Sequence, residues 1–169
     1  NKYFAFEPPF KSDDKIAQKA FYEMAINQKC DIIVTLDPGQ FYDNTMSTRG
    51  FLQAGEDVTF GHNNEYSIKC SDRIEREEEF LVRRLTLRRG YTEKKFKHFA
   101  IDRKDPSIKG EYFLNFENFF NLAERIYKEV ENAGGNKNIF VNCMHSTDRT
   151  GAFIVIYNIY RQILRKELT

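Results

Sequence analysis

Cys143 and Arg149 are separated by five residues, in a stretch that continues to Thr150 and Gly151. A strand-like apolar run at 138–142 precedes this stretch, and a run with the character of a helix follows it. Backbone N–H groups at a helix N-terminus bind anions, and an arginine guanidinium can add two hydrogen bonds to phosphate oxygens. The same positive field favours the thiolate of Cys143, which is the nucleophilic form. The spacing therefore predicts a phosphate-binding loop with a cysteine nucleophile, to whose sulfur Thr150 can donate its hydroxyl.

Alternating helix and strand patterns surround this loop and must position it. A helix at 15–29 leads directly into a buried strand at 31–36, which indicates an α/β domain. Short strand pieces are expected near Val58 and at 66–69. The remaining expected elements are a β-hairpin of 79–87 with 94–101, a helix at 116–133 ended by two glycines, the strand at 138–142 and a largely apolar, buried helix at 151–164. We expect a mixed, mostly parallel central sheet flanked by helices.

Composition limits the classes of function. The 169 residues include 26 Lys+Arg, 25 Asp+Glu and 41% apolar residues, which fits one globular domain over 1–169. A net charge of +1 argues against a nucleic-acid partner, and the apolar run at 151–157 is far shorter than the ~20 residues of a membrane span. We therefore expect no nucleic-acid partner and no stable membrane insertion.

The three cysteines, Cys30, Cys70 and Cys143, have no paired spacing, and the chain holds only three histidines. This pattern argues against a disulfide scaffold and against a zinc module, so no metal or cofactor is expected. Cys30 and Cys70 are interpreted as small apolar residues in or near strands. Unpaired cysteines favour a cytoplasmic location, or the cytosolic domain of a larger protein.

Basic residues are concentrated between Val82 and His98, where seven of them accompany a single acid, Glu93. This segment fits the solvated face of a hairpin better than a specific site, but its charge can also attract acidic or phosphorylated partners or anionic lipid headgroups. Tyr91, at the hairpin tip, is expected to be exposed. His62 and His98 have no partner spacing, and no chemistry is assigned to them.

The sequence resembles the cysteine-dependent protein tyrosine phosphatases, specifically their classical tyrosine-specific branch, over nearly the whole chain. Val141–Gly151 is similar to the family signature V-H-C-x₅-R-T-G, and His98-Phe99 is similar to the H-F that leads to the general-acid loop. The other matching segments are Tyr3–Pro9 (Y-I-A-T-Q-G-P), Ile32–Leu36 (I-V-M-L-T), Phe80–Leu87 (Y-T-V-R-x-L-x-L) and the helix start at Phe113–Phe116.

The resemblance implies a phosphotyrosine phosphatase that acts on phosphorylated proteins without metal or cofactor. In it, Cys143 attacks phosphorus and Arg149 with the loop backbone holds the phosphate oxygens. The phosphate-binding residues implied are Cys143, Met144, His145, Ser146, Thr147, Asp148, Arg149 and Thr150. The family's upstream phosphotyrosine-recognition loop and downstream glutamine loop lack counterparts here, so we expect a domain that is incomplete at both ends relative to the family. The oligomeric state is not predicted.

Three departures from the family pattern bear on activity. Asn142 stands where the family has histidine, and Ser146 and Asp148 stand where it has glycine. The W-P-D general-acid motif is absent, and the chain contains no tryptophan; Asp105, one position out of register, and Asp102 are the candidates that remain. Loss of a general acid removes a factor of about 10²–10⁴ in rate. The alternative interpretation is therefore a weak or inactive pseudophosphatase that binds phosphorylated protein.

Asp148 offers a further alternative. Its D-R-T sequence is similar to the loop of myotubularin and Sac-type phosphoinositide phosphatases, in which the acid lies inside the loop. A protonated Asp148 would then serve as the catalytic acid on a lipid substrate. Cys143, His145 and Arg149 with the following Thr-Gly are also similar to the C-T-H-G-x-N-R-T-G loop of RNA triphosphatases. These two alternatives rest on the loop alone.

Overall fold

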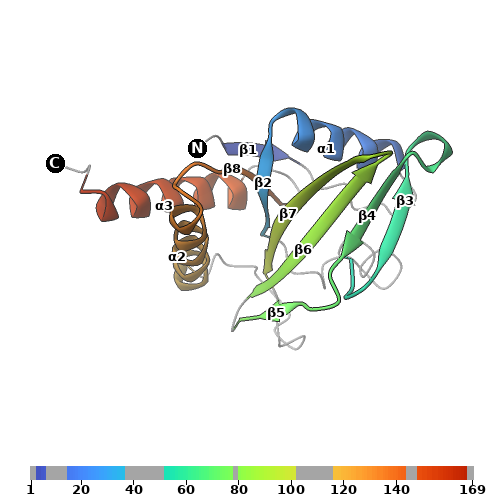
Figure 1. Ribbon diagram of the computed structural model, residues 1–169. Helices are drawn as coiled ribbons and strands as arrows, with labels where there is room; N and C mark the ends of the chain where they lie inside the picture. Colours follow the sequence, from blue (N-terminus) through green and yellow to red (C-terminus); the bar gives the residue numbers. More distant parts are fainter. Residues whose placement is uncertain are drawn as a thin grey trace.

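The computed structural model describes residues 3–6, 15–36, 52–77, 80–101, 116–143 and 148–166, with only the backbone of 3–6 and 116. Within these ranges the chain forms one eight-stranded sheet with helices on both faces (Figure 1). The strand order is β1-β8-β2-β7-β6-β4-β3, and β5 pairs with β6 outside this path. The predicted α/β fold with a mixed central sheet is confirmed.

The parallel half of the sheet holds the strand that leads to the phosphate-binding loop. It consists of β1 (Tyr3–Phe6), β8 (Asn138–Asn142), β2 (Cys30–Thr35) and β7 (Thr92–Ile101), each parallel to its neighbour. β8 lies between β1 and β2 and is buried along most of its length, as its run of apolar residues favours. Cys143 follows it directly.

The other half of the sheet is antiparallel. β6 (Phe80–Arg89) forms the predicted hairpin with β7, and the turn between them contains Gly90 at a φ of 55°. The sheet then continues through β4 (Tyr66–Cys70) and β3 (Asp57–Phe60), with the two-residue β5 (Glu75–Arg76) beside β6 and a short 3-10 helix, η2 (His62–Asn64), before β4.

The expectation of a mostly parallel sheet is wrong for the described strands. Three strand pairs are parallel and four are antiparallel. The reason is that the hairpin does not stand at the sheet edge: β4 and β5 pair with β6, and β3 pairs with β4, so the chain adds short meandering strands beyond it. The sequence predicts the short strands near Val58 and at 66–69, but it does not show that they pair antiparallel beyond the hairpin.

The two faces of the sheet carry separate cores. α2 (Phe116–Asn132) and α3 (Asp148–Leu164) cover one face, and Cys143 lies in the core beneath them. α1 (Lys15–Asn27) covers the other face, over a core that includes Phe21, Phe60 and Phe140. Figure 1 shows α2 and α3 together at one end of the sheet, beside β8 and β2, and α1 along the opposite side.

α2 confirms the helix predicted at 116–133. Its buried residues recur every three or four positions, which places them on one stripe facing the sheet; they are Phe119, Leu122, Ala123, Ile126 and Val130. The helix ends in two glycines with positive φ, and the N–H of Gly135 donates to the carbonyl of Val130 at 2.8 Å. The ring of Phe119 meets Phe153 of α3 edge-on, with ring centroids 5.8 Å apart.

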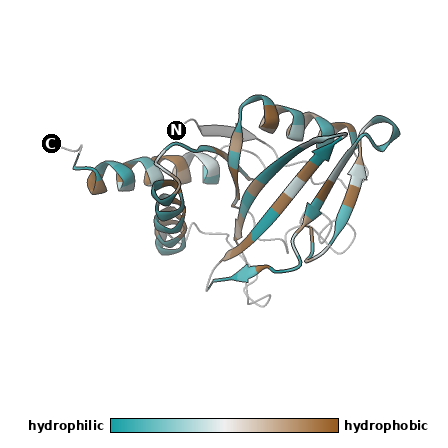
Figure 2. Ribbon diagram, viewed as in Figure 1, coloured by the Kyte–Doolittle hydropathy of each residue, from teal (hydrophilic) through white to brown (hydrophobic). Residues whose placement is uncertain are grey.

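α3 differs from the expectation in two respects. It begins at Asp148, three residues before the predicted start at Gly151, so Arg149 and Thr150 belong to its first turn. It is also not buried all round: Phe153, Ile156 and Tyr157 are buried, but other apolar residues of the helix are exposed. Figure 2 shows hydrophobic residues distributed along the length of α3. The outward apolar residues are Val155, Ile159, Ile163 and Leu164. None of the described helices is both long and apolar enough to cross a bilayer.

Candidate active site

The cysteine of the predicted loop stands at the junction between the sheet and α3. β8 ends at Asn142, whose carbonyl accepts a hydrogen bond from the N–H of Leu36, and Cys143 is the next residue. Its side chain is 3% exposed and packs in the core under α2 and α3. Cys143 is a free thiol. A central strand with partners on both sides therefore holds the backbone of Cys143.

Thr150 binds the cysteine sulfur. Its Oγ1 donates a hydrogen bond to Sγ of Cys143 over 3.0 Å, and both side chains are buried. Side chains in a helix lean toward its N-terminus, so a threonine in the first turn of α3 points back to the residue at the end of β8. A hydroxyl donor stabilises a thiolate more than a thiol. This is the contact predicted from the sequence, and it is confirmed.

Arg149 and Asp148 begin the helix. Arg149 is half-buried and Asp148 is exposed, each in the first turn of α3. Arg149 therefore stands one residue from Thr150, whose side chain touches the cysteine sulfur. A carboxylate in the first turn of a helix is stabilised by the helix dipole, which gives Asp148 a structural role besides any chemical one.

The other residues of the predicted site lie outside the described part of the chain. These are the loop residues Met144, His145, Ser146 and Thr147 and the two candidate acids Asp102 and Asp105. The described residues thus bring together Cys143, Thr150 and the start of α3. The positions of the remaining loop residues and of the general acid stay predictions.

Asn142 has an unusual environment. It is 1% exposed, and its side-chain Oδ1 is buried with no hydrogen-bond partner among the described residues. Residues alternate between the two faces of a strand, so Asn142 lies on the face opposite Cys143. A buried acceptor without a partner costs free energy, about 1–3 kcal/mol. The asparagine is therefore an imperfect substitute for the histidine of the family signature.

A row of buried polar residues that the sequence did not reveal lies on the same face as Asn142. His98 is 5% exposed, and its Nε2 lies 2.9 Å from Oγ1 of Thr35, the residue paired with Asn142 in the sheet register. Arg83 is opposite His98 in the register and donates from Nε to the carbonyl of Leu52 at 3.0 Å. Burial, helped by the nearby Arg83 charge, lowers the pKa of His98 to about 3.

This row corrects two expectations. Arg83 was assigned to a solvated hairpin face, but it is only 4% exposed. His98 was given no chemistry, but it is a neutral hydrogen-bonding group beneath the strand ends. The signal for both was the position of Arg83 and His98 in the alternating pattern of the hairpin, where each occupies an inward-facing site between apolar residues.

The other cysteines are not reactive groups. Cys30 and Cys70 are fully buried in the core under α1, as predicted from their strand positions. Burial raises the pKa of both thiols, that of Cys30 to about 12. Within the described ranges, no group of three or more His, Cys, Asp or Glu side chains is arranged to hold a metal ion.

The comparisons agree with this geometry. A solved structure, described as the structural basis of the PTPN18 fingerprint on distinct HER2 tyrosine phosphorylation sites, matches with a TM-score of 0.71 and 13% sequence identity. The match covers 99% of this chain and 56% of that chain, so the chain spans little more than half of it. At this identity the likeness concerns the fold. No curated protein sequence matches the chain significantly.

The family model for the protein-tyrosine phosphatases matches residues 8–168. That range contains the strand, the cysteine, the arginine and the threonine that donates to the sulfur. The family match, the fold and the Cys143–Thr150 contact all agree with one family assignment. The chain belongs to the protein-tyrosine phosphatase family.

Proposed function

We propose that the chain removes phosphate from phosphotyrosine in proteins through a cysteinyl-phosphate intermediate on Cys143. The observation that carries the proposal is the hydrogen bond from Thr150 Oγ1 to Cys143 Sγ at the start of α3. A hydroxyl held against a sulfur stabilises a thiolate and later the thiolate leaving group. Membership of the phosphatase family supports the same chemistry.

The reaction has two steps. In the first, Cys143 Sγ attacks phosphorus in line, the bond from phosphorus to the tyrosine oxygen breaks, and that oxygen takes a proton from a general acid, for which we propose Asp105. In the second, water attacks phosphorus and gives a proton to the carboxylate that acted as the acid in the first step, the S–P bond breaks, and inorganic phosphate leaves while Cys143 returns to its thiolate. Arg149 and the backbone N–H groups of 144–148 stabilise the equatorial oxygens in both steps.

A pseudophosphatase is the second candidate, and the environment of Asn142 favours it. Its buried Oδ1 without a partner indicates that the support beneath Cys143 is weaker than a fully satisfied network would be. Such a protein would still bind phosphate through Arg149 and the loop backbone. It would hold a phosphorylated partner without turnover.

Turnover assays separate the two candidates. We expect the purified chain to hydrolyse p-nitrophenyl phosphate and a phosphotyrosine peptide, and Cys143→Ser to abolish both activities. Arg149→Ala should abolish them too, with Arg149→Lys retaining part of the activity and Arg73→Ala, an exposed arginine elsewhere, retaining all of it. Phosphotyrosine-peptide binding without turnover, weakened by Arg149→Ala, would support the pseudophosphatase in place of the enzyme. Faster release of phosphate from a phosphoinositide than from the peptide would indicate a lipid substrate instead of a protein substrate.

A further inference from the structure

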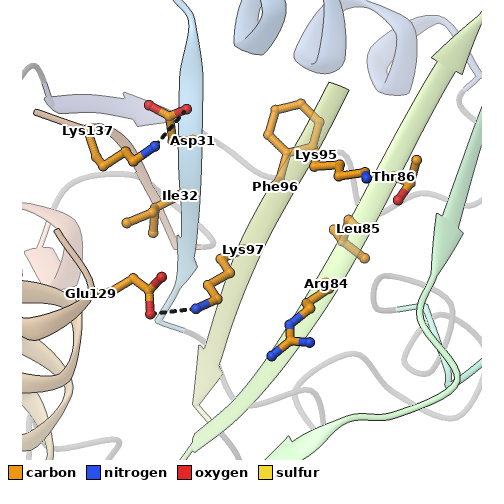
Figure 3. A pocket seen from close by; sticks show the side chains of 10 residues that line it. All are labelled: Asp31, Ile32, Arg84, Leu85, Thr86, Lys95, Phe96, Lys97, Glu129 and Lys137. Atoms are coloured by element: carbon orange, nitrogen blue, oxygen red, sulfur yellow. Dashed lines mark ion pairs between the residues drawn. The ribbon is translucent and has the colours of Figure 1, made fainter. Parts of the chain in front are cut away.

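A cavity of about 250 Å³ opens on the sheet, away from the cysteine (Figure 3). Its walls come from β2, the facing parts of β6 and β7, the second half of α2 and Lys137 just before β8. None of the residues assigned above to catalysis or phosphate binding lines it. Its most open side is the antiparallel half of the sheet, where Arg84 and Lys95 extend outward with 65% and 77% of their side chains exposed.

The lining has a marked excess of positive charge. Four of its residues are cations (Arg84, Lys95, Lys97 and Lys137) and two are anions (Asp31 and Glu129), which gives 4 − 2 = +2. The whole chain carries only +1. The local field of this cavity therefore attracts anions although the molecule as a whole is nearly neutral.

Asp31 is already occupied by cations. It accepts from Lys94 at 3.2 Å and lies 3.8 Å from Lys137, and its second oxygen accepts the backbone N–H of Asn138 at 3.2 Å. Figure 3 shows Lys137 turned toward Asp31 at one side of the cavity. An anion that enters the cavity is therefore not opposed by an uncompensated Asp31 carboxylate.

Arg84 and Lys97 stand directly opposite each other on β6 and β7. Like charges at opposite positions of neighbouring strands destabilise a sheet. Each is compensated from a different side: Arg84 by Glu75 at 2.7 Å and Lys97 by Glu129 at 2.5 Å. The sheet thus keeps two cations side by side, with their acids drawn from outside the pair, where neutral residues would serve stability better.

The exposed cations are loosely held. The acid partners of Arg84 and Lys95 are Glu75 and Glu93, and neither of these acids lines the cavity. Ion pairs at such exposure contribute little to stability, so an incoming anion can replace the acids. Arg84 and Lys95 can therefore turn to a ligand while Lys97 and Lys137 hold its inner side.

We propose that this cavity is a second anion site, which binds one phosphorylated side chain of a protein. A phosphomonoester carries −1.5 to −2 charges at neutral pH, which matches the +2 of the lining. The volume is below the 300–1,000 Å³ typical of sites for drug-sized ligands, so it suits a single side chain. Of the apolar lining residues, Ile32 lies on this face of the sheet and gives the stem an apolar contact, whereas the side chains of Leu85 and Phe96 are buried in the core under α1 on the other face.

A protein ligand fits better than a membrane surface. Lys97 and Lys137, with 26% and 33% of their side chains exposed, are less accessible to a plane of lipid headgroups than Arg84 and Lys95, with 65% and 77%. A bilayer would contact mainly Arg84 and Lys95. The inner cations contribute only to a ligand that enters, and an extended peptide can place one side chain into a cavity beside the sheet.

The test is binding of a fluorescein-labelled glycine–serine peptide with one phosphoserine, measured by anisotropy in the Arg149→Ala background. That background removes the guanidinium of the catalytic loop, so binding reports the second site whether or not the loop is active. We expect Arg84→Gln with Lys95→Gln to weaken binding about tenfold, and 150 mM added salt to weaken it further. The matched pair Arg73→Gln with Lys15→Gln, both exposed and outside the lining, should change it less than about twofold.

Nuclear magnetic resonance gives the location. The peptide should shift the backbone amide signals of Ile32, Leu85 and Phe96 but not those of β8. Unchanged affinity in the Arg84/Lys95 double variant would overturn the proposal. Equal binding of the unphosphorylated peptide would also overturn it. Binding of phosphatidylserine vesicles through Arg84 and Lys95, without binding of the phosphopeptide, would overturn it as well. Absence of turnover in the chain that keeps Arg149, with peptide binding intact in the Arg149→Ala background, would count against the proposed function alone.

Discussion

The Thr150 hydroxyl donates to the Cys143 sulfur across the junction of a central strand and the first turn of α3. One partner is fixed by the sheet and the other by the helix, so the contact reports that both elements are in place. The position of Cys143 is fixed because it follows β8 directly. The position of Thr150 is fixed because it is buried in the first turn of α3.

Removing this hydroxyl should slow the chemistry of the cysteine. Hydrogen bonds to charged groups contribute about 1.5–3 kcal/mol, so Thr150→Val should slow alkylation of Cys143 by iodoacetamide at neutral pH at least about tenfold. Thr150→Ser should keep the rate, and the exposed Thr59→Val is the matched control. Intact-protein mass spectrometry measures the rate, and equal rates in Thr150→Val and the unchanged chain would refute a role for the contact.

The three thiols should react in a fixed order. Burial raises the pKa of Cys30 to about 12 and raises that of Cys70, so at pH 7 to 8 both remain protonated and unreactive. Limited iodoacetamide treatment should therefore modify Cys143 first. Peptide mapping after a single modification checks this, and label on Cys30 or Cys70 in folded protein would contradict it.

His98 should make the fold sensitive to acid. Its folded pKa of about 3 lies below the unfolded value of about 6.5, so between these values the unfolded chain binds a proton that the folded chain excludes. Stability is fully present above pH 6.5 and declines as pH falls toward 3, by about 1.4 kcal/mol per unit in the middle of this window. Urea unfolding of the unchanged chain and His98→Gln at pH 7, 6 and 5 measures the slope. The prediction fails if both proteins lose stability equally between pH 6 and 5.

Asp148 and Asp105 should have different effects on catalysis. Asp148 is exposed in the first turn of α3, so Asp148→Asn should cost about 0.3–1 kcal/mol of stability and remove a negative charge beside the anion site. We expect tighter binding of inorganic phosphate and a retained turnover number. Asp105→Asn should lower turnover by about 10²–10⁴. The reverse pattern in the pH profile of kcat would assign the acid to Asp148.

Arg125 should be the most important surface charge for the attachment of α2. It donates to Glu77 at 2.8 Å and to Glu129 at 3.2 Å, and its guanidinium lies 5.7 Å from the centroid of Phe99. The side chain is only 25% exposed, so the network is screened less than an exposed pair. Arg125→Ala should lower the free energy of unfolding by about 1–3 kcal/mol, as measured in urea, whereas Lys128→Ala on the exposed side of α2 should change it much less. A smaller loss for Arg125→Ala than for Lys128→Ala would contradict this.

Strongly periodic segments allowed most of the fold to be predicted. The stripe of α2, the alternation in β6 and β7 and the buried run at 138–142 each depend on local sequence, and all three are confirmed. The Thr150–Cys143 contact was also predictable, because strand–loop–helix connectivity determines where the first turn points.

Features that depend on tertiary partners could not be predicted in the same way. β1 is assigned only because it pairs with β8, and nothing within its four residues distinguishes a strand from a loop. The sequence predicts that the exposed apolar face of α3 is buried, because Val155 and Ile159 are as apolar as core residues. Arg83 and His98 carry the residue types of a surface, and only the register shows that they face inward.

The position of β8 also sets the order of assembly during synthesis. It pairs with β1 through Tyr3 and Ile139, and with β2 through Ile33 and Phe140, so its partners are made long before it emerges. Contacts at such sequence separation form late, after the loop entropy between them has been overcome. The antiparallel hairpin can fold while the chain is still growing. The backbone of Cys143 therefore gains its strand pairing and its helix later than the hairpin forms.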